Sequence, residues 1–317
     1  MKKVWVLLVM SFLLQFGLPQ TASAQTNRVV SYQEFYDALS PYGQWINDAK
    51  LGYVWIPNVN DDFRPYFTDG HWAVTEYGNT WVSDYPWGWA CFHYGCWIYN
   101  DYFGWIWIPG KDWGPGWVAW RWGAGFCGWA PLYPGIDWAG DNYNCPQDWW
   151  VFLHTKYLYK PHYRNVWRSD FMDGPLHTQK MLQKTKFVTN VCETNKTRYF
   201  SGPFAAEVAQ ITCEKVVLYK SSWAAVRGAD RISDNVVYIY RLAKTAAPLA
   251  GSSNPAPSDF MEPLRSVSSP DEITKNWNKP RPFKLDLQKH NPAFNYPFIR
   301  DNPPYFNYPR TQSMEED

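Results

Sequence analysis

Three residues in the first half of the chain have the types that bind zinc. Cys91, His93 and Cys96 lie close together, and thiolate and imidazole are common zinc ligands. In an extended segment, Cys91 and His93 share one face of the strand, whereas Cys96 points to the other. The remaining histidines show no close ligand spacing. We therefore predict no metal site, and we expect these cysteines to form disulfides instead.

A glycine pattern further along resembles a nucleotide-binding fingerprint. Gly123, Gly125 and Gly128 match G-x-G-x-x-G, which requires a strand before it and a helix after it to hold a pyrophosphate. Here Trp129 and Pro131 continue as extended chain. The pattern therefore favours a hairpin turn or a bulge, and we predict no cofactor.

Carboxylates are frequent in the same half, and a glycosidase needs two of them across a cleft. Asp48 occupies the turn that Asn100 and Asp101 occupy further on, which favours a turn-forming role. We find no local nucleophile, zinc-protease or phosphate-loop motif. We predict no catalytic residue, and an enzyme acting on cell-wall or extracellular glycans is kept as the alternative to a non-catalytic protein.

Basic and aromatic residues alternate around position 160. Lys160, Arg164 and Arg168 are spaced by four, beside Tyr159 and Tyr163. On a helix this spacing would place a basic stripe beside an aromatic one, but Pro161 disfavours the helix. We interpret the segment as solvated surface.

The elements that would position any site begin with a repeat. The motif YGQWI…GYVWIP (42–57) returns as YGCWI…GWIWIP (94–109), offset by 52 residues without a gap. A regular offset predicts two copies of one supersecondary unit. We expect Trp45 to superpose on Trp97, and Trp55 on Trp107, with matching burial.

The aromatic surplus is the main functional clue, since the chain has 21 Trp and 22 Tyr. Both faces of the expected strands are apolar, so most Trp must be core. Four lie at turns, where exposure would allow contact with a glycan or another envelope protein. These candidate ligand-binding residues are Trp87, Trp89, Trp113 and Trp117.

The N-terminal residues predict export. Lys2 and Lys3 precede an apolar run, and Ala22-Ser23-Ala24 forms a cleavage site, so we expect a signal peptide at 1–24 and a periplasmic or extracellular protein. We expect no transmembrane span in the mature chain. A net charge of +1 and export argue against nucleic acid as a binding partner.

The oxidising surroundings of an exported protein favour disulfides. We pair Cys192 with Cys213 and leave three pairings open among the remaining cysteines, Cys91, Cys96, Cys127 and Cys145.

Composition divides the mature chain into three parts. The segment 25–140 is a Trp/Tyr-rich β domain, 141–245 a small α+β domain, and 246–317 a Pro-rich tail expected to be disordered. The fold class is mainly β, with antiparallel strands in a pseudo-symmetric sandwich or barrel. A helix is expected after Ser31 and another after Pro203, with Phe204, Val208 and Ile211 on one face. The expected strands outside the repeated motif are 72–75, 80–83, 117–122, 126–130, 149–153, 186–191, 215–219 and 236–241.

Several motifs of the chain carry a family resemblance: SYQEFYDALSPYGQW, GYVWIP, FRPYFTDGHW, TWVSDYPWGWACFHYGCW, GWIWIPG and FCGWAPLYPG. Together with a weaker pattern downstream they cover roughly 31–241, and they resemble DUF6600, a family of exported bacterial proteins of unknown function. It implies export and a shared fold, but no reaction or site residues. Cys91, Cys96 and Cys127 depart from the family pattern, which suggests a disulfide particular to this lineage.

Overall fold

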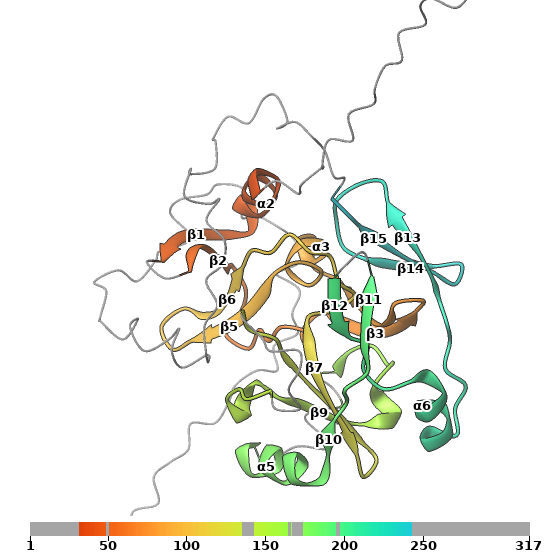
Figure 1. Ribbon diagram of the computed structural model, residues 1–317. Helices are drawn as coiled ribbons and strands as arrows, with labels where there is room; N and C mark the ends of the chain where they lie inside the picture. The colour runs from red at the N-terminus through yellow and green to blue at the C-terminus, as the bar shows by residue number, and fades with distance from the viewer. Residues whose placement is uncertain are drawn as a thin grey trace, which may run out of the picture.

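The computed structural model describes residues 32–48, 51–134, 143–163, 166, 174–194 and 197–242. The expected leader at 1–24 and the expected tail at 246–317 lie outside these residues. Within them the protein is mainly β, with antiparallel sheets, as the sequence predicted (Figure 1).

The two copies of the repeated motif form equivalent hairpins. They are β1 (Gly43–Asp48) with β2 (Gly52–Pro57), and β5 (Cys96–Asn100) with β6 (Gly104–Ile108). Trp45 pairs with Trp55 in the first hairpin, as Trp97 pairs with Trp107 in the second. One sheet of order β1-β2-β6-β5 contains both hairpins, joined where Trp55 lies opposite Trp107. The predicted repeat is confirmed.

Burial matches at one pair of equivalent positions and differs at the other. Trp55 and Trp107 are both fully buried, whereas Trp97 is buried and Trp45 is only half-buried. Trp45 lies on the edge strand β1 and stacks on Tyr36 of helix α2 (Tyr32–Leu39). The expectation of matching burial is therefore wrong for Trp45.

A second pair of hairpins extends the repeat. They are β3 (Gly70–Thr75) with β4 (Gly78–Ser83), and β7 (Val118–Gly123) with β8 (Phe126–Pro131). Trp72 faces Trp81 in the first, and Trp120 faces Trp129 in the second. The indoles meet in one cluster, with centroids 4.6 Å apart for Trp72–Trp120 and 5.7 Å for Trp120–Trp129. Each copy thus contains two hairpins, and the second hairpins supply the centre of the core.

Two strands from beyond residue 140 complete the sheet of the second hairpin. They are β9 (Val151–His154) and β10 (Lys186–Phe187), in the order β10-β7-β8-β9. Strands from both sides of the expected domain boundary at residue 140 therefore belong to one sheet. Short helical segments connect these parts of the fold: η2 (Ser40–Tyr42), α3 (Gly88–Cys91), η3 (Gln147–Trp149), η4 (Thr155–Tyr157) and α5 (Gly174–Lys184).

The C-terminal elements pack against this body. They are β11 (Val191–Thr194), β12 (Thr197–Phe200), α6 (Ala205–Thr212), β13 (Lys220–Ala224), β14 (Arg231–Ser233) and β15 (Val236–Tyr240). The expected helix and the strand at 236–241 are confirmed. The strand predicted at 215–219 is wrong, because only Leu218 forms a β-bridge, to Val74. On α6, Val208 is buried, whereas Phe204 and Ile211 are exposed. None of the helices in the described ranges has the length and apolar character of a membrane span.

Candidate ligand pocket

The turns that carry the candidate aromatic residues are packed into the core. Trp87, Trp89 and Trp113 are buried, and Trp117 is half-buried. Trp87 stacks on Tyr85 at 4.4 Å. The indole N–H of Trp117 donates to the carbonyl oxygen of a buried histidine at 3.1 Å. The expected exposure of these aromatic residues is therefore wrong for three of the four, and they do not form an open surface.

The cysteines are free in the structure, all six of them lying in described residues. The predicted disulfide between Cys192 and Cys213 is not formed, since Cys192 lies in β11 and Cys213 is the exposed residue that ends α6. Cys91 and Cys127 are fully buried, and burial raises the pKa of both thiols. They fill space in the core as small apolar groups do.

Both ring nitrogens of His93 contact protein oxygens. Its Nε2 lies 3.3 Å from Oδ2 of Asp230, and its Nδ1 lies 2.9 Å from the carbonyl oxygen of Gly114. The backbone N–H of Ser83 donates to the same Asp230 oxygen at 3.0 Å. Both side chains are fully buried. No cluster of metal-binding side chains occurs in the described part of the chain. The pair therefore joins the C-terminal sheet to the body.

The glycine pattern forms a turn, as the sequence indicated. Gly123 ends β7, and Gly125, with φ at +79°, lies in the tight connection to β8. No helix follows, so the N–H groups that would hold a pyrophosphate are not assembled there.

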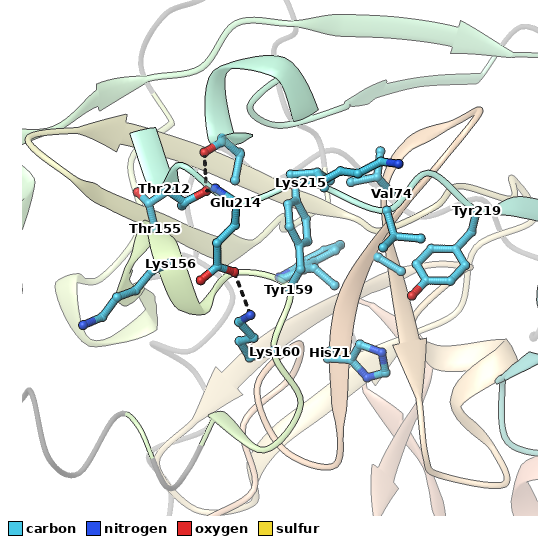
Figure 2. A pocket seen from close by; sticks show the side chains of 15 residues that line it. His71, Val74, Thr155, Lys156, Tyr159, Lys160, Thr212, Glu214, Lys215 and Tyr219 are labelled. Atoms are coloured by element: carbon cyan, nitrogen blue, oxygen red, sulfur yellow. Dashed lines mark hydrogen bonds and ion pairs between the residues drawn. The ribbon is translucent and has the colours of Figure 1, made fainter. Parts of the chain in front are cut away.

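The described residues enclose a pocket of about 140 Å³ between β3, η4, α6 and the segment 214–219. Figure 2 shows Thr155 and Thr212 on one side of it, with His71 and Tyr219 on the other. A single water needs only ~10–15 Å³. The pocket therefore has room for a group of several heavy atoms.

Lysines give the pocket a positive lining. Lys156, Lys160 and Lys215 contribute to it and are exposed. Lys160 pairs with Glu214 at 2.8 Å, and both side chains are about half exposed, so the pair is solvated. Such a surface pair is worth only ~0–1 kcal/mol. Lys160 is therefore able to exchange Glu214 for another anion at little cost.

One polar group of the pocket wall lacks a partner. Thr155 is 2% exposed, and its Oγ1 has no hydrogen-bond partner among the described residues. A buried hydroxyl without a partner costs ~1–3 kcal/mol. By contrast, the hydroxyl of Tyr159 donates to Asn79 Oδ1 at 2.8 Å. Thr155 thus leaves a buried, unsatisfied hydroxyl in the wall of the pocket.

His71 supplies a ring that is neutral near pH 7. Burial, and then the charge of His162, lower the pKa of His71 from 6.5. A neutral imidazole both donates and accepts a hydrogen bond. The pocket wall therefore combines ammonium groups with neutral donors.

Sequence reasoning missed this pocket. Its lining comes from segments far apart in the chain, and Tyr159 and Lys160 belong to the stretch interpreted as solvated surface. The only local signal was the run KYLYK at 156–160, in which two lysines flank two tyrosines. No sequence pattern indicated that His71 or Thr212 would lie nearby.

Comparisons with known proteins give one match. Searches of curated proteins and of solved structures found none. The profile of a family of unknown function (DUF6600) matches residues 36–136, which include all four hairpins of the repeat. The repeated half of this chain is therefore similar to DUF6600, as its motifs indicated.

Proposed function

We propose that this chain is an exported, non-catalytic binding module of the cell envelope. In this proposal the Trp-rich hairpins are the scaffold, and the pocket between β3, η4 and α6 is the ligand site. The observation that carries the proposal is the lysine-lined cavity, whose wall also contains the unsatisfied hydroxyl of Thr155. Export itself is proposed from the leader-like residues 1–24.

The charges favour a ligand with an anionic group. Lys156 and Lys215 have no carboxylate partner among the described ion pairs, while Lys160 holds Glu214 by a solvated contact. A bound carboxylate or phosphate would gain charge-assisted hydrogen bonds from these ammonium groups. In this proposal the Thr155 hydroxyl, which has no partner, turns towards the bound group and donates to it.

The pocket supports binding better than glycan hydrolysis. A glycosidase uses two carboxyl groups across the scissile bond. Glu214 is the one carboxylate in the described lining, and it faces Lys160. The carboxylates singled out in the repeated half do not line this pocket.

Calorimetric titration of the chain from Gln25 onward tests the proposal. The probes are inorganic phosphate and galacturonate, with neutral galactose as the control ligand at constant ionic strength. We expect saturable binding of the anions alone. Thr155→Val should weaken it several-fold, since a charge-assisted hydrogen bond is worth ~1.5–3 kcal/mol. Lys160→Ala should also weaken it, and Lys186→Ala, an exposed lysine on β10, should not.

Two results would contradict the proposal. One is the absence of saturable binding of either anion. The other is equal binding by wild type and Thr155→Val, which would mean that the hydroxyl is only an unsatisfied group. In that case Thr155→Val would raise the free energy of unfolding, by ~1 kcal/mol, and leave the titration unchanged.

A further inference from the structure

Exposed aliphatic side chains lie beside the lysines of the pocket. Val217 is 47% exposed and Leu218 67% exposed, in the segment that connects α6 to β13. Lys215 and Lys220, in and directly after this segment, are exposed too. Val217 and Lys215 both line the pocket. The rim is therefore amphiphilic, with apolar and cationic groups a residue or two apart.

The backbone of this segment is held in place while the side chains of Val217 and Leu218 are exposed. Leu218 forms a parallel bridge to Val74, and the N–H of Tyr219 donates to the carbonyl oxygen of Val74 at 2.8 Å. This anchoring keeps the segment at the pocket while Leu218 remains in solvent. Val217 and Leu218 are thus two adjacent aliphatic side chains held at a fixed position on the surface.

The charges around the rim favour an anionic partner. Lys156, Lys215 and Lys220 are exposed and have no ion pair among the described contacts. The ammonium of Lys156 lies over the ring of Tyr157, at the outer edge of the pocket. Two carboxylates face these lysines: Glu214 pairs with Lys160, and Glu76 accepts from the N–H and hydroxyl of Ser221 and keeps its charge. With Lys160 the rim has four lysines against these two carboxylates, so its excess charge is positive.

We propose that the pocket receives the anionic headgroup of a membrane lipid, with Val217 and Leu218 entering the acyl boundary. This inference rests on the proposed function, because it names the source of the anion bound there. Single projecting aliphatic residues beside lysines suit a lipid surface, to which peripheral proteins bind by shallow apolar insertion plus attraction to anionic headgroups. A protein partner would instead be expected to cover a broad, well-packed patch.

The contact is shallow. Two aliphatic side chains bury little area, so binding depends on anionic lipid and weakens as salt screens the lysines. Different residues therefore supply the two contributions to membrane binding, recognition of the headgroup and apolar insertion. Pocket residues determine recognition of the headgroup, and Leu218 contributes apolar insertion alone.

Co-sedimentation with vesicles tests the inference on the chain from Gln25 onward. Vesicles of phosphatidylglycerol and phosphatidylcholine in equal amounts are compared with pure phosphatidylcholine. Leu218→Ser should reduce partitioning into the anionic vesicles about tenfold. The matched control is Val226→Ser, which changes a 77% exposed valine beyond the far end of β13 and should have no effect. Neither variant should alter calorimetric binding of inorganic phosphate.

The outcomes are distinguishable from those of the proposed function. Phosphate binding without binding to anionic vesicles would overturn the lipid inference and leave the pocket as a site for a soluble or protein-borne anion. Vesicle binding that Leu218→Ser leaves unchanged would also overturn it. Absence of both phosphate and vesicle binding would overturn the proposed function as well.

Discussion

Replacing Asp230 by alanine should destabilise the whole body through one buried contact. The change removes the oxygen that accepts from Ser83 N–H at 3.0 Å and lies 3.3 Å from His93 Nε2. Both polar groups would remain buried, because His93 and Ser83 are fully inaccessible. A buried polar group left without its partner costs ~1–3 kcal/mol, so the two groups together cost ~2–6 kcal/mol. For folded units of ~150–250 residues each kcal/mol lowers Tm by ~2–4 °C, so we expect a loss of about 10 °C.

Urea unfolding followed by circular dichroism measures this effect, with the m-value showing whether unfolding stays cooperative. Asp230→Asn keeps an oxygen for Ser83 N–H and should cost only ~1–2 kcal/mol. The control is Glu193→Ala, which breaks a 3.3 Å pair with Arg198 whose side chains are 61% and 55% exposed, and which should cost less than ~1 kcal/mol. If Asp230→Ala lies within about 1 kcal/mol of wild type, the buried pair does not join the two parts.

Three further results are expected. Gly128→Ala should lower stability by ~1–3 kcal/mol in the same urea assay, because its Cβ would lie 2.2 Å from a ring carbon of Phe152; unchanged stability would mean that the sheet is looser than described. Cys213 should react with a thiol reagent in the folded protein and Cys127 only after unfolding; rapid labelling of all six would contradict the packing. Burial raises the pKa of Tyr94 from 10.0 to about 12, so its protonated form stabilises the fold fully below pH 10, and that contribution is lost as pH rises towards 12; unfolding curves that do not change over this range would refute it.

The hairpins were predictable because their signals are local. Period-2 alternation and a turn glycine suffice for a two-stranded unit, and the offset copy repeats both. Gly52 and Gly104 each have φ at +72°, the left-handed conformation that glycine adopts readily. Such positions depend on neighbouring residues alone, so the sequence contains the necessary information.

Burial and the pocket depend on contacts between distant segments. His93 and Asp230 are 137 positions apart, and no periodic pattern in the sequence indicates that their side chains are in contact. Trp87 and Trp113 were expected to be exposed because they lie at turns, but these turns face the centre of a shared core. The strand predicted at 186–191 is likewise limited to the two residues of β10, which pair with β7; that pairing joins distant segments, and the local sequence does not show it.

The contact between Trp55 and Trp107 has a consequence for how the molecule could be divided. These residues are counterparts in the two copies, and they also lie opposite each other between antiparallel strands. Equivalent residues that lie opposite each other on antiparallel strands are related by a two-fold axis that passes between them. This is the symmetry of an isologous dimer. Each hairpin therefore presents an edge complementary to itself. A shortened chain carrying one copy would expose that edge, and self-association through its own tryptophan would restore the missing half.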